Sequence, residues 1–212
     1  MKIDEIRAVG LRKCTPKGGW ASEIQADDCV HTLITVHTDE GITGWGSVFT
    51  NDGLVQAALK MMEQALVKCP QSLWDAPEDH NKFWHVAYHA LFYLHLYMQD
   101  TEKDFRPWVN HRDEYQFMGQ TPWPPHAPPH IAEPYTRADL LAYLEFVRQQ
   151  VRERVPALDL QAASGFDWLP FGKLELQFYN LRHLQHHLAE LYERLGSRAG
   201  IDLDWVGSLP DL

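Results

Sequence analysis

The chain has 212 residues, a formal net charge of −10 and 45% hydrophobic residues, a composition typical of an ordered globular protein. It has no apolar run of about 20 residues, which excludes a membrane-spanning helix, and its net acidity disfavours binding to nucleic acid. The first ten residues lack an apolar segment after a basic one, and the three cysteines form no CxxC pair, so we expect a cytoplasmic protein without disulfides.

Residues 1–50 show the pattern of β-strands. Apolar residues alternate with polar ones in residues 2–11 and again in residues 29–38, and a long polar stretch between them predicts a loop. A turn at Asp39–Gly41 leads to a short returning strand at about residues 42–45. The prediction is a small antiparallel sheet, which would be only marginally stable by itself.

From Asn51 onward the apolar residues recur with the period of a helix. Asn51 or Asp52 can cap a first helix that Pro70 ends, and a second helix is predicted over residues 81–98. A long Pro-rich connection follows, over residues 99–135, and we leave open whether it lines a pocket or only packs over the helices.

Two more helices are predicted after this connection. One begins at Thr136, where Thr136 and Asp139 have the spacing of a capping box, and it ends at Pro156. The other covers about residues 173–195 and ends at Gly196. The expected fold is therefore mainly α: an up-down four-helix bundle over residues 51–212, with the three-stranded β segment appended, α+β overall.

The histidine content is high, with twelve residues, and histidine is the commonest metal ligand in proteins. His183 and His187 lie four residues apart in the last predicted helix, so both rings project from one face and can bind one ion. That face also carries the leucines expected to point into the bundle, whereas His186 lies about 100° away and is expected to face out or to sit at the rim.

The second predicted helix carries another pair with the same spacing, His85 and His89. His89 lies on the expected inward stripe and His85 lies beside it. One histidine of this helix together with His183 and His187 would give three nitrogen ligands and leave a coordination position open, as in catalytic zinc sites. The opposing interpretation is a metal-free network of core imidazoles, because an isolated pair of this spacing usually faces solvent or forms hydrogen bonds.

The segment from about residue 54 to 206 resembles the DinB-like (YfiT-like) metalloenzyme superfamily. The resemblance lies in two phrases, CPQSLWDAPEDHNKFWHVAYHALFYLHLYM and LELQFYNLRHLQHHLAELYERLG. It implies a four-helix bundle whose metal is held by one histidine of the second helix and a His-x-x-x-His pair of the last. On this sequence the pair falls on His183 and His187, and the remaining ligand falls on His89, with His85 as the alternative.

The DinB resemblance implies a divalent metal (zinc, nickel or iron), a small-molecule substrate and, in some members, a low-molecular-weight thiol.

Residues 1–60 instead resemble the N-terminal capping domain of the mandelate racemase and muconate lactonizing enzymes of the enolase superfamily, through MKIDEIRAVG and VHTLITVHTDEGITGWGSVFT. The (β/α)₈ barrel that carries their catalytic residues does not fit in this chain, so no catalytic residue is transferred. A natural fusion and a chimera of two sequences both remain open.

The leading functional hypothesis is a metal-dependent hydrolase or thiol transferase, in which the metal activates water or a thiol toward a small molecule. The first alternative is a non-catalytic, stress-associated bundle that binds a metal or ligand. A second alternative is an enolase-type cap that acts with a partner barrel. The β segment could close the metal pocket or form a homodimer by pairing of edge strands.

Overall fold

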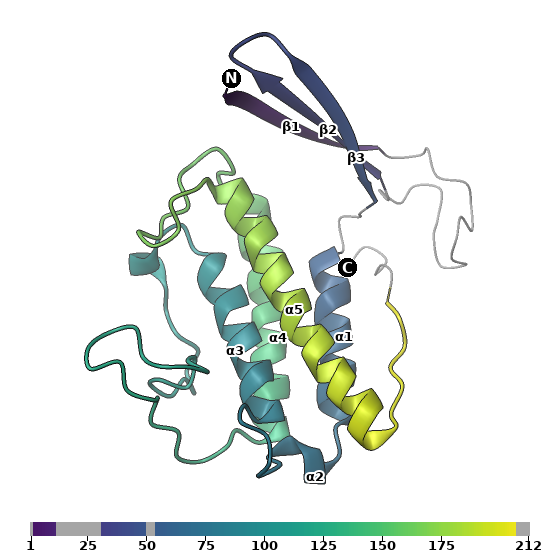
Figure 1. Cartoon of the computed structure of the whole chain (residues 1–212), viewed down its shortest axis with the longest axis vertical. Helices are drawn as coiled ribbons and strands as arrows, with labels where there is room; N and C mark the ends of the chain where they lie inside the picture. The colour runs from purple at the N-terminus through teal and green to yellow at the C-terminus, as the bar shows by residue number, and fades with distance from the viewer. Residues whose placement is uncertain (1, 12–30, 50–53, 207–212) are drawn as a thin grey trace. The chain divides into compact units, whose positions relative to one another are not determined.

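The computed structural model describes residues 2–11, 31–49 and 54–206. Within these ranges the chain is an α+β protein with five α-helices and a three-stranded antiparallel sheet (Figure 1). The chain divides into two compact units, one built around the sheet and the other running from Ala58 to Trp205.

The sheet is a simple meander of β1 (Ile3–Leu11), β2 (His31–Thr38) and β3 (Thr43–Phe49). Both pairs are antiparallel, and a register shift interrupts the β1–β2 pair between Ile3 and Glu5. The predicted turn between β2 and β3 is confirmed: the Gly41 amide donates to the Thr38 carbonyl, and Gly41 has the positive φ of 78° that glycine adopts without strain. The third strand is longer than predicted, and the expected polar loop before β2 lies outside the described residues.

Four long helices form the framework of the second unit: α1 (Leu54–Lys68), which begins four residues before it, α3 (Phe83–Tyr97), α4 (Arg137–Arg154) and α5 (Lys173–Ala199). A one-turn helix, α2 (Gln71–Trp74), and two 3₁₀ turns, η1 (Glu102–Asp104) and η2 (Val155–Ala157), complete it. The four long helices match the predicted ones, whereas α2 and η1 were not predicted, because single turns are too short to show a period.

The long helices lie side by side (Figure 1). Helix α3 packs against both α4 and α5. Helix α1 is joined to α4 by an ion pair between Arg148 and Glu63 of 2.7 Å, and to α5 by the Tyr192 hydroxyl, which donates to the Met61 carbonyl. The core between them is apolar and aromatic, and its fully buried side chains include Leu59, Leu66, Trp84, Tyr88, Leu91, Leu140 and Tyr143.

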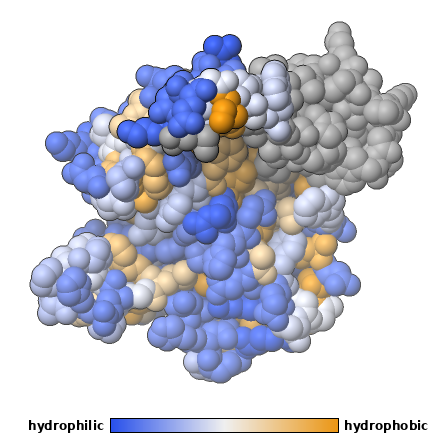
Figure 2. Space-filling model, turned by 45° about the horizontal axis from the view of Figure 1, so that its top comes forward, coloured by the Kyte–Doolittle hydropathy of each residue, from blue (hydrophilic) through white to orange (hydrophobic). Residues whose placement is uncertain are grey.

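Hydrophilic residues predominate on the face of the molecule that Figure 2 shows, as the composition leads one to expect. No helix in the described part of the chain is long and apolar enough to cross a membrane.

Local sequence rules predict one helix end correctly and another incorrectly. At the start of α4 the Thr136 hydroxyl accepts from the Asp139 amide, and the Asp139 carboxylate accepts from the Thr136 amide, so the predicted capping box is confirmed. The prediction that α5 ends at Gly196 is wrong. Gly196 stays helical, and the helix ends where Gly200 takes a φ of 64° and its amide donates to the Gly196 carbonyl.

Candidate metal centre

Three imidazoles from two helices meet where α3 packs against α5. The Nε2 atom of His183 lies 3.1 Å from Nε2 of His89 and 3.2 Å from Nε2 of His187. One nitrogen of each ring lies within 4.8 Å of the others, so the group has the spacing of a metal site. These are the three histidines predicted from the sequence, and the structure brings them together.

The helical period explains this convergence. His183 and His187 are one turn apart on α5, and each is followed by a fully buried leucine, Leu184 and Leu188, so the pair lies at the border of the core-facing stripe. His89 lies at the matching border of α3, where its neighbour Ala90 is fully buried. Side chains at the edges of two packed helices reach each other, which places the rings together.

The other ring nitrogen, Nδ1, has a different environment in each of the three histidines. Nδ1 of His89 lies 2.6 Å from the Gln116 carbonyl, and Nδ1 of His187 lies 3.1 Å from the Glu190 carboxylate. Both partners accept only, so both Nδ1 atoms carry hydrogen and both Nε2 atoms keep a free lone pair. Nδ1 of His183 is buried and has no hydrogen-bond partner among the described residues.

Burial keeps these imidazoles neutral. It is the main cause that lowers the pKa of His89 to about 3, with repulsion from His187 and His183 adding to it. Burial also lowers the pKa of His183 to about 4, again with a contribution from His187. The pKa of His187 is lowered by burial as well, partly opposed by Glu190. Neutral imidazole is the form that binds metals, so the cluster is ready for a cation at neutral pH.

Two tyrosines pack against the cluster. The Tyr93 ring centroid lies 4.8 Å from that of His89 and 5.4 Å from that of His183, and Tyr179 is stacked on His183 at 6.5 Å. Burial raises the pKa of Tyr93 to about 12, with a contribution from Tyr179. The Tyr93 hydroxyl therefore stays protonated at neutral pH.

The alternative ligand His85 lies outside the cluster. It is buried, and its Nε2 lies 2.8 Å from the Tyr115 carbonyl in the long connection between α3 and α4. His186 is exposed, as predicted, but its ring centroid is 5.0 Å from that of His187. With Glu190, these two histidines form a second group of closely spaced potential ligands.

Sequence reasoning missed two partners of the cluster. Glu190 follows His187 by three residues on the same helix, a spacing that brings side chains together, so the sequence did contain this signal. The Gln116 carbonyl gave no signal, because every residue has a backbone carbonyl and only the fold selects one. The connection that carries it is thus part of the surroundings of the site.

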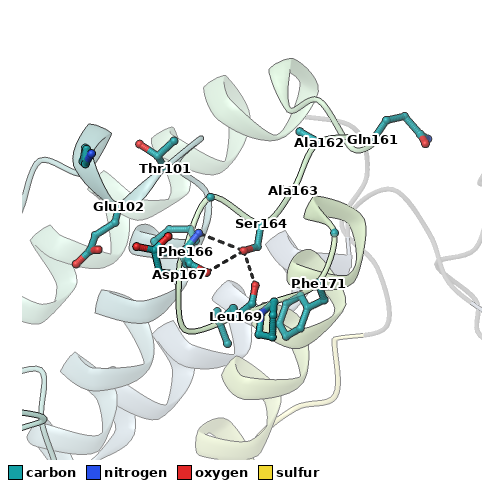
Figure 3. A pocket seen from close by; sticks show the side chains of 14 residues that line it. Thr101, Glu102, Gln161, Ala162, Ala163, Ser164, Phe166, Asp167, Leu169 and Phe171 are labelled. Carbon is teal, nitrogen blue, oxygen red and sulfur yellow. Dashed lines mark hydrogen bonds between the residues drawn. The ribbon is translucent and has the colours of Figure 1, made fainter.

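A cavity of about 700 Å³ lies at a different place in this unit, between residues 101–103 and residues 161–172 (Figure 3). Ser164 holds together the loop that lines this cavity: its hydroxyl donates to the Leu169 carbonyl at 2.6 Å and accepts from the Phe166 amide at 3.1 Å. None of the three clustered histidines lines it.

Comparison of the chain with known protein families, with curated proteins and with solved structures finds no match. The resemblances to the DinB-like superfamily and to the enolase capping domain therefore stay predictions.

Proposed function

We propose that the Ala58–Trp205 unit is a DinB-type four-helix bundle in which His89, His183 and His187 bind one divalent metal cation. The bound cation would serve a hydrolase or thiol-transferase reaction on a small molecule. One observation carries the proposal: three Nε2 atoms from two helices converge, with neighbouring distances of 3.1 and 3.2 Å.

The donor set fits a divalent cation. Nitrogens bound to one such ion at about 2.0–2.1 Å lie roughly 2.9–3.4 Å apart when the angle between them is 90–110°. The two measured distances fall within this range. Imidazole suits zinc, nickel and iron, and three protein ligands leave a position for a substrate or water.

A bound divalent cation supplies Lewis acidity, which lowers the pKa of a coordinated water or thiol toward neutrality. The residues of the chain prepare the site for it. His89 and His187 present bare Nε2 atoms because their Nδ1 hydrogens are donated to the Gln116 carbonyl and to Glu190. The ring of Tyr93 packs against the rings of His89 and His183.

The same distances also favour a second candidate, a non-catalytic bundle that binds a metal or ligand or holds a purely structural imidazole network. Separations of 3.1 and 3.2 Å are hydrogen-bond lengths. In a metal-free protein, the Nε2 hydrogen of His183 can be shared between His89 and His187, which leaves only its Nδ1 without a partner.

Metal content measured by mass spectrometry tests whether the histidine cluster binds a cation or is a metal-free imidazole network. The protein is stripped with a chelator, loaded separately with zinc, nickel or iron(II), and dialysed. We expect about one cation per chain in the wild type and in His186→Ala, and a loss of binding of at least tenfold in His183→Ala. A wild type that retains no cation, or a His183→Ala variant that retains it fully, contradicts the proposed site.

Turnover then separates the enzyme from the binding bundle. The loaded protein is assayed against panels of hydrolysis and thiol-transfer substrates, with His183→Ala as the inactive reference. Metal-dependent turnover supports the enzyme. A fully loaded protein that is inactive across both panels favours the non-catalytic alternative.

A further inference from the structure

The Glu190 carboxylate joins the candidate metal centre to an ion pair one turn further along the same face of α5. One of its oxygens lies 3.1 Å from Nδ1 of His187, and the other lies 2.9 Å from the Arg194 guanidinium, one turn further along α5. Arg194 also donates to the Asn81 carbonyl at 2.6 Å, just before α3. The fold therefore fixes both groups that donate to the Glu190 carboxylate, the His187 ring and the Arg194 guanidinium.

We infer that Glu190 is a positioning residue, which fixes the tautomer and the orientation of His187 for cation binding. The inference deepens the proposed function and rests on it. A metal-binding histidine needs hydrogen on the nitrogen away from the ion, and a carboxylate that accepts this hydrogen also makes the imidazole a stronger ligand. Glu190 is the partner that the described structure provides for that nitrogen.

Only a carboxylate satisfies both neighbours of this position. The Nδ1–H of His187 and the guanidinium of Arg194 are both donors, and glutamate accepts from both because its two oxygens are equivalent acceptors. Glutamine has one oxygen and one NH₂ group. If the oxygen faces Arg194, the NH₂ group faces His187 and favours the tautomer with bare Nδ1 and protonated Nε2. That tautomer cannot bind a metal through Nε2.

This geometry also decides against a second cation at His186, His187 and Glu190, although these residues are closely spaced. Such a cation would need the carboxylate oxygen and the Nδ1 lone pair of His187. The oxygen already accepts from that nitrogen, and the other oxygen is paired with Arg194. The arrangement is complete without a second ion.

The test compares Glu190→Gln with Glu193→Gln in the full chain. Both variants remove one negative charge from the same helix, but Glu193 is exposed and lies three residues further on. The first measurement is the dissociation constant for zinc, by competition with a chromophoric chelator. We expect Glu190→Gln to bind zinc about 10–100-fold more weakly than the wild type, and Glu193→Gln to bind within threefold of it.

The second measurement is the tautomer of His187 in the metal-free protein, from nitrogen-15 chemical shifts of the histidine rings. We expect hydrogen on Nδ1 in the wild type and in Glu193→Gln, and a shift toward hydrogen on Nε2 in Glu190→Gln. A merely structural role for Glu190 would not move this signal. Metal-free unfolding curves of the two variants check that both fold.

The outcomes separate the inference from its premise. If the wild type binds zinc and Glu190→Gln binds it within threefold, the positioning role is wrong while the metal site stands. Weaker binding with an unchanged His187 tautomer also overturns the inference, because the effect then comes from charge or stability. If the wild type binds no zinc, the proposed function fails and the inference fails with it.

Discussion

The Nε2 atoms of His89 and His183 lie 3.1 Å apart although 94 residues separate them in the chain. Two like ring nitrogens at this distance must share either a hydrogen or a cation, because two facing lone pairs would repel each other. This contact is therefore the place where a hydrogen-bonded imidazole network and a metal site have to be distinguished.

The affinity for a cation should depend little on pH between 7.5 and 6.0. A free imidazole has a pKa of about 6.5, so protons compete with metals below that pH. Burial lowers the pKa of His89 to about 3 and that of His183 to about 4, and it also lowers the pKa of His187, so protons compete less at all three rings than at a free imidazole. Zinc dissociation constants, corrected for the buffer, should change less than threefold. A tenfold loss at pH 6.0 would contradict the low pKa values.

His85 and His89 should respond differently to replacement by alanine. His85→Ala removes the contact with the Tyr115 carbonyl and the stacking on Trp84, whose ring centroid is 5.1 Å away. We expect this variant to lose about 1–3 kcal/mol of unfolding free energy and to keep stoichiometric zinc. His89→Ala should lose the zinc. Chemical denaturation and metal content measure the two effects, and loss of zinc in folded His85→Ala would restore His85 as a ligand.

The sequence predicted the three clustered histidines because their position follows from short-range periodicity. A spacing of four residues places His183 and His187 on one face, and the apolar stripe of α3 orients His89. No local signal specifies the pairing of α3 with α5: it is assumed when the inward faces of the two helices are combined, and the family resemblance implies it as well. Without a rule that says which helices touch, a histidine on one helix cannot be assigned to a pair on another.

Features of the site and the fold that depend on tertiary contacts could not be predicted from the sequence. The Gln116 carbonyl beside His89 belongs to a connection without periodicity, and its place is set by packing. The end of α5 shows the same limit: a glycine at 196 and another at 200 are equal signals in sequence. The bonds that end the helix, from the Gly200 amide to the Gly196 carbonyl and from the Ile201 amide to the Leu195 carbonyl, select the second.

The buried His95 should make the protein less stable in acid. Its side chain is 2% exposed and packs on Phe105 and Phe146, and burial, with a contribution from Arg154, lowers its pKa to about 4. The unfolded chain, with a histidine pKa of about 6.5, takes up the proton first. The contribution of His95 is thus complete above pH 6.5 and is lost as the pH falls toward 4.

Between pH 7 and pH 5 this linkage should cost about 2 kcal/mol of unfolding free energy. The variant His95→Phe should lose less stability over this range than the wild type, in urea unfolding at both pH values. His80→Gln, which removes an exposed histidine, serves as the control. Equal acid losses in the wild type and His95→Phe would show that the acid sensitivity arises elsewhere.

Among the lysines that the structure describes, Lys173 should be the most costly to replace. Its side chain is 2% exposed, and its ammonium donates to the carbonyls of Gln99, Asp100 and Ser164. These bonds hold the start of α5 to the segments that enclose the cavity of Figure 3. Lys173→Met keeps the length of the stem but leaves three carbonyls without their donor, so we expect a loss of roughly 2–4 kcal/mol in chemical denaturation. Lys103→Met, at an exposed lysine of the same cavity, should change stability by less than about 0.5 kcal/mol. Equal small effects in both variants would mean that water replaces the ammonium at these carbonyls.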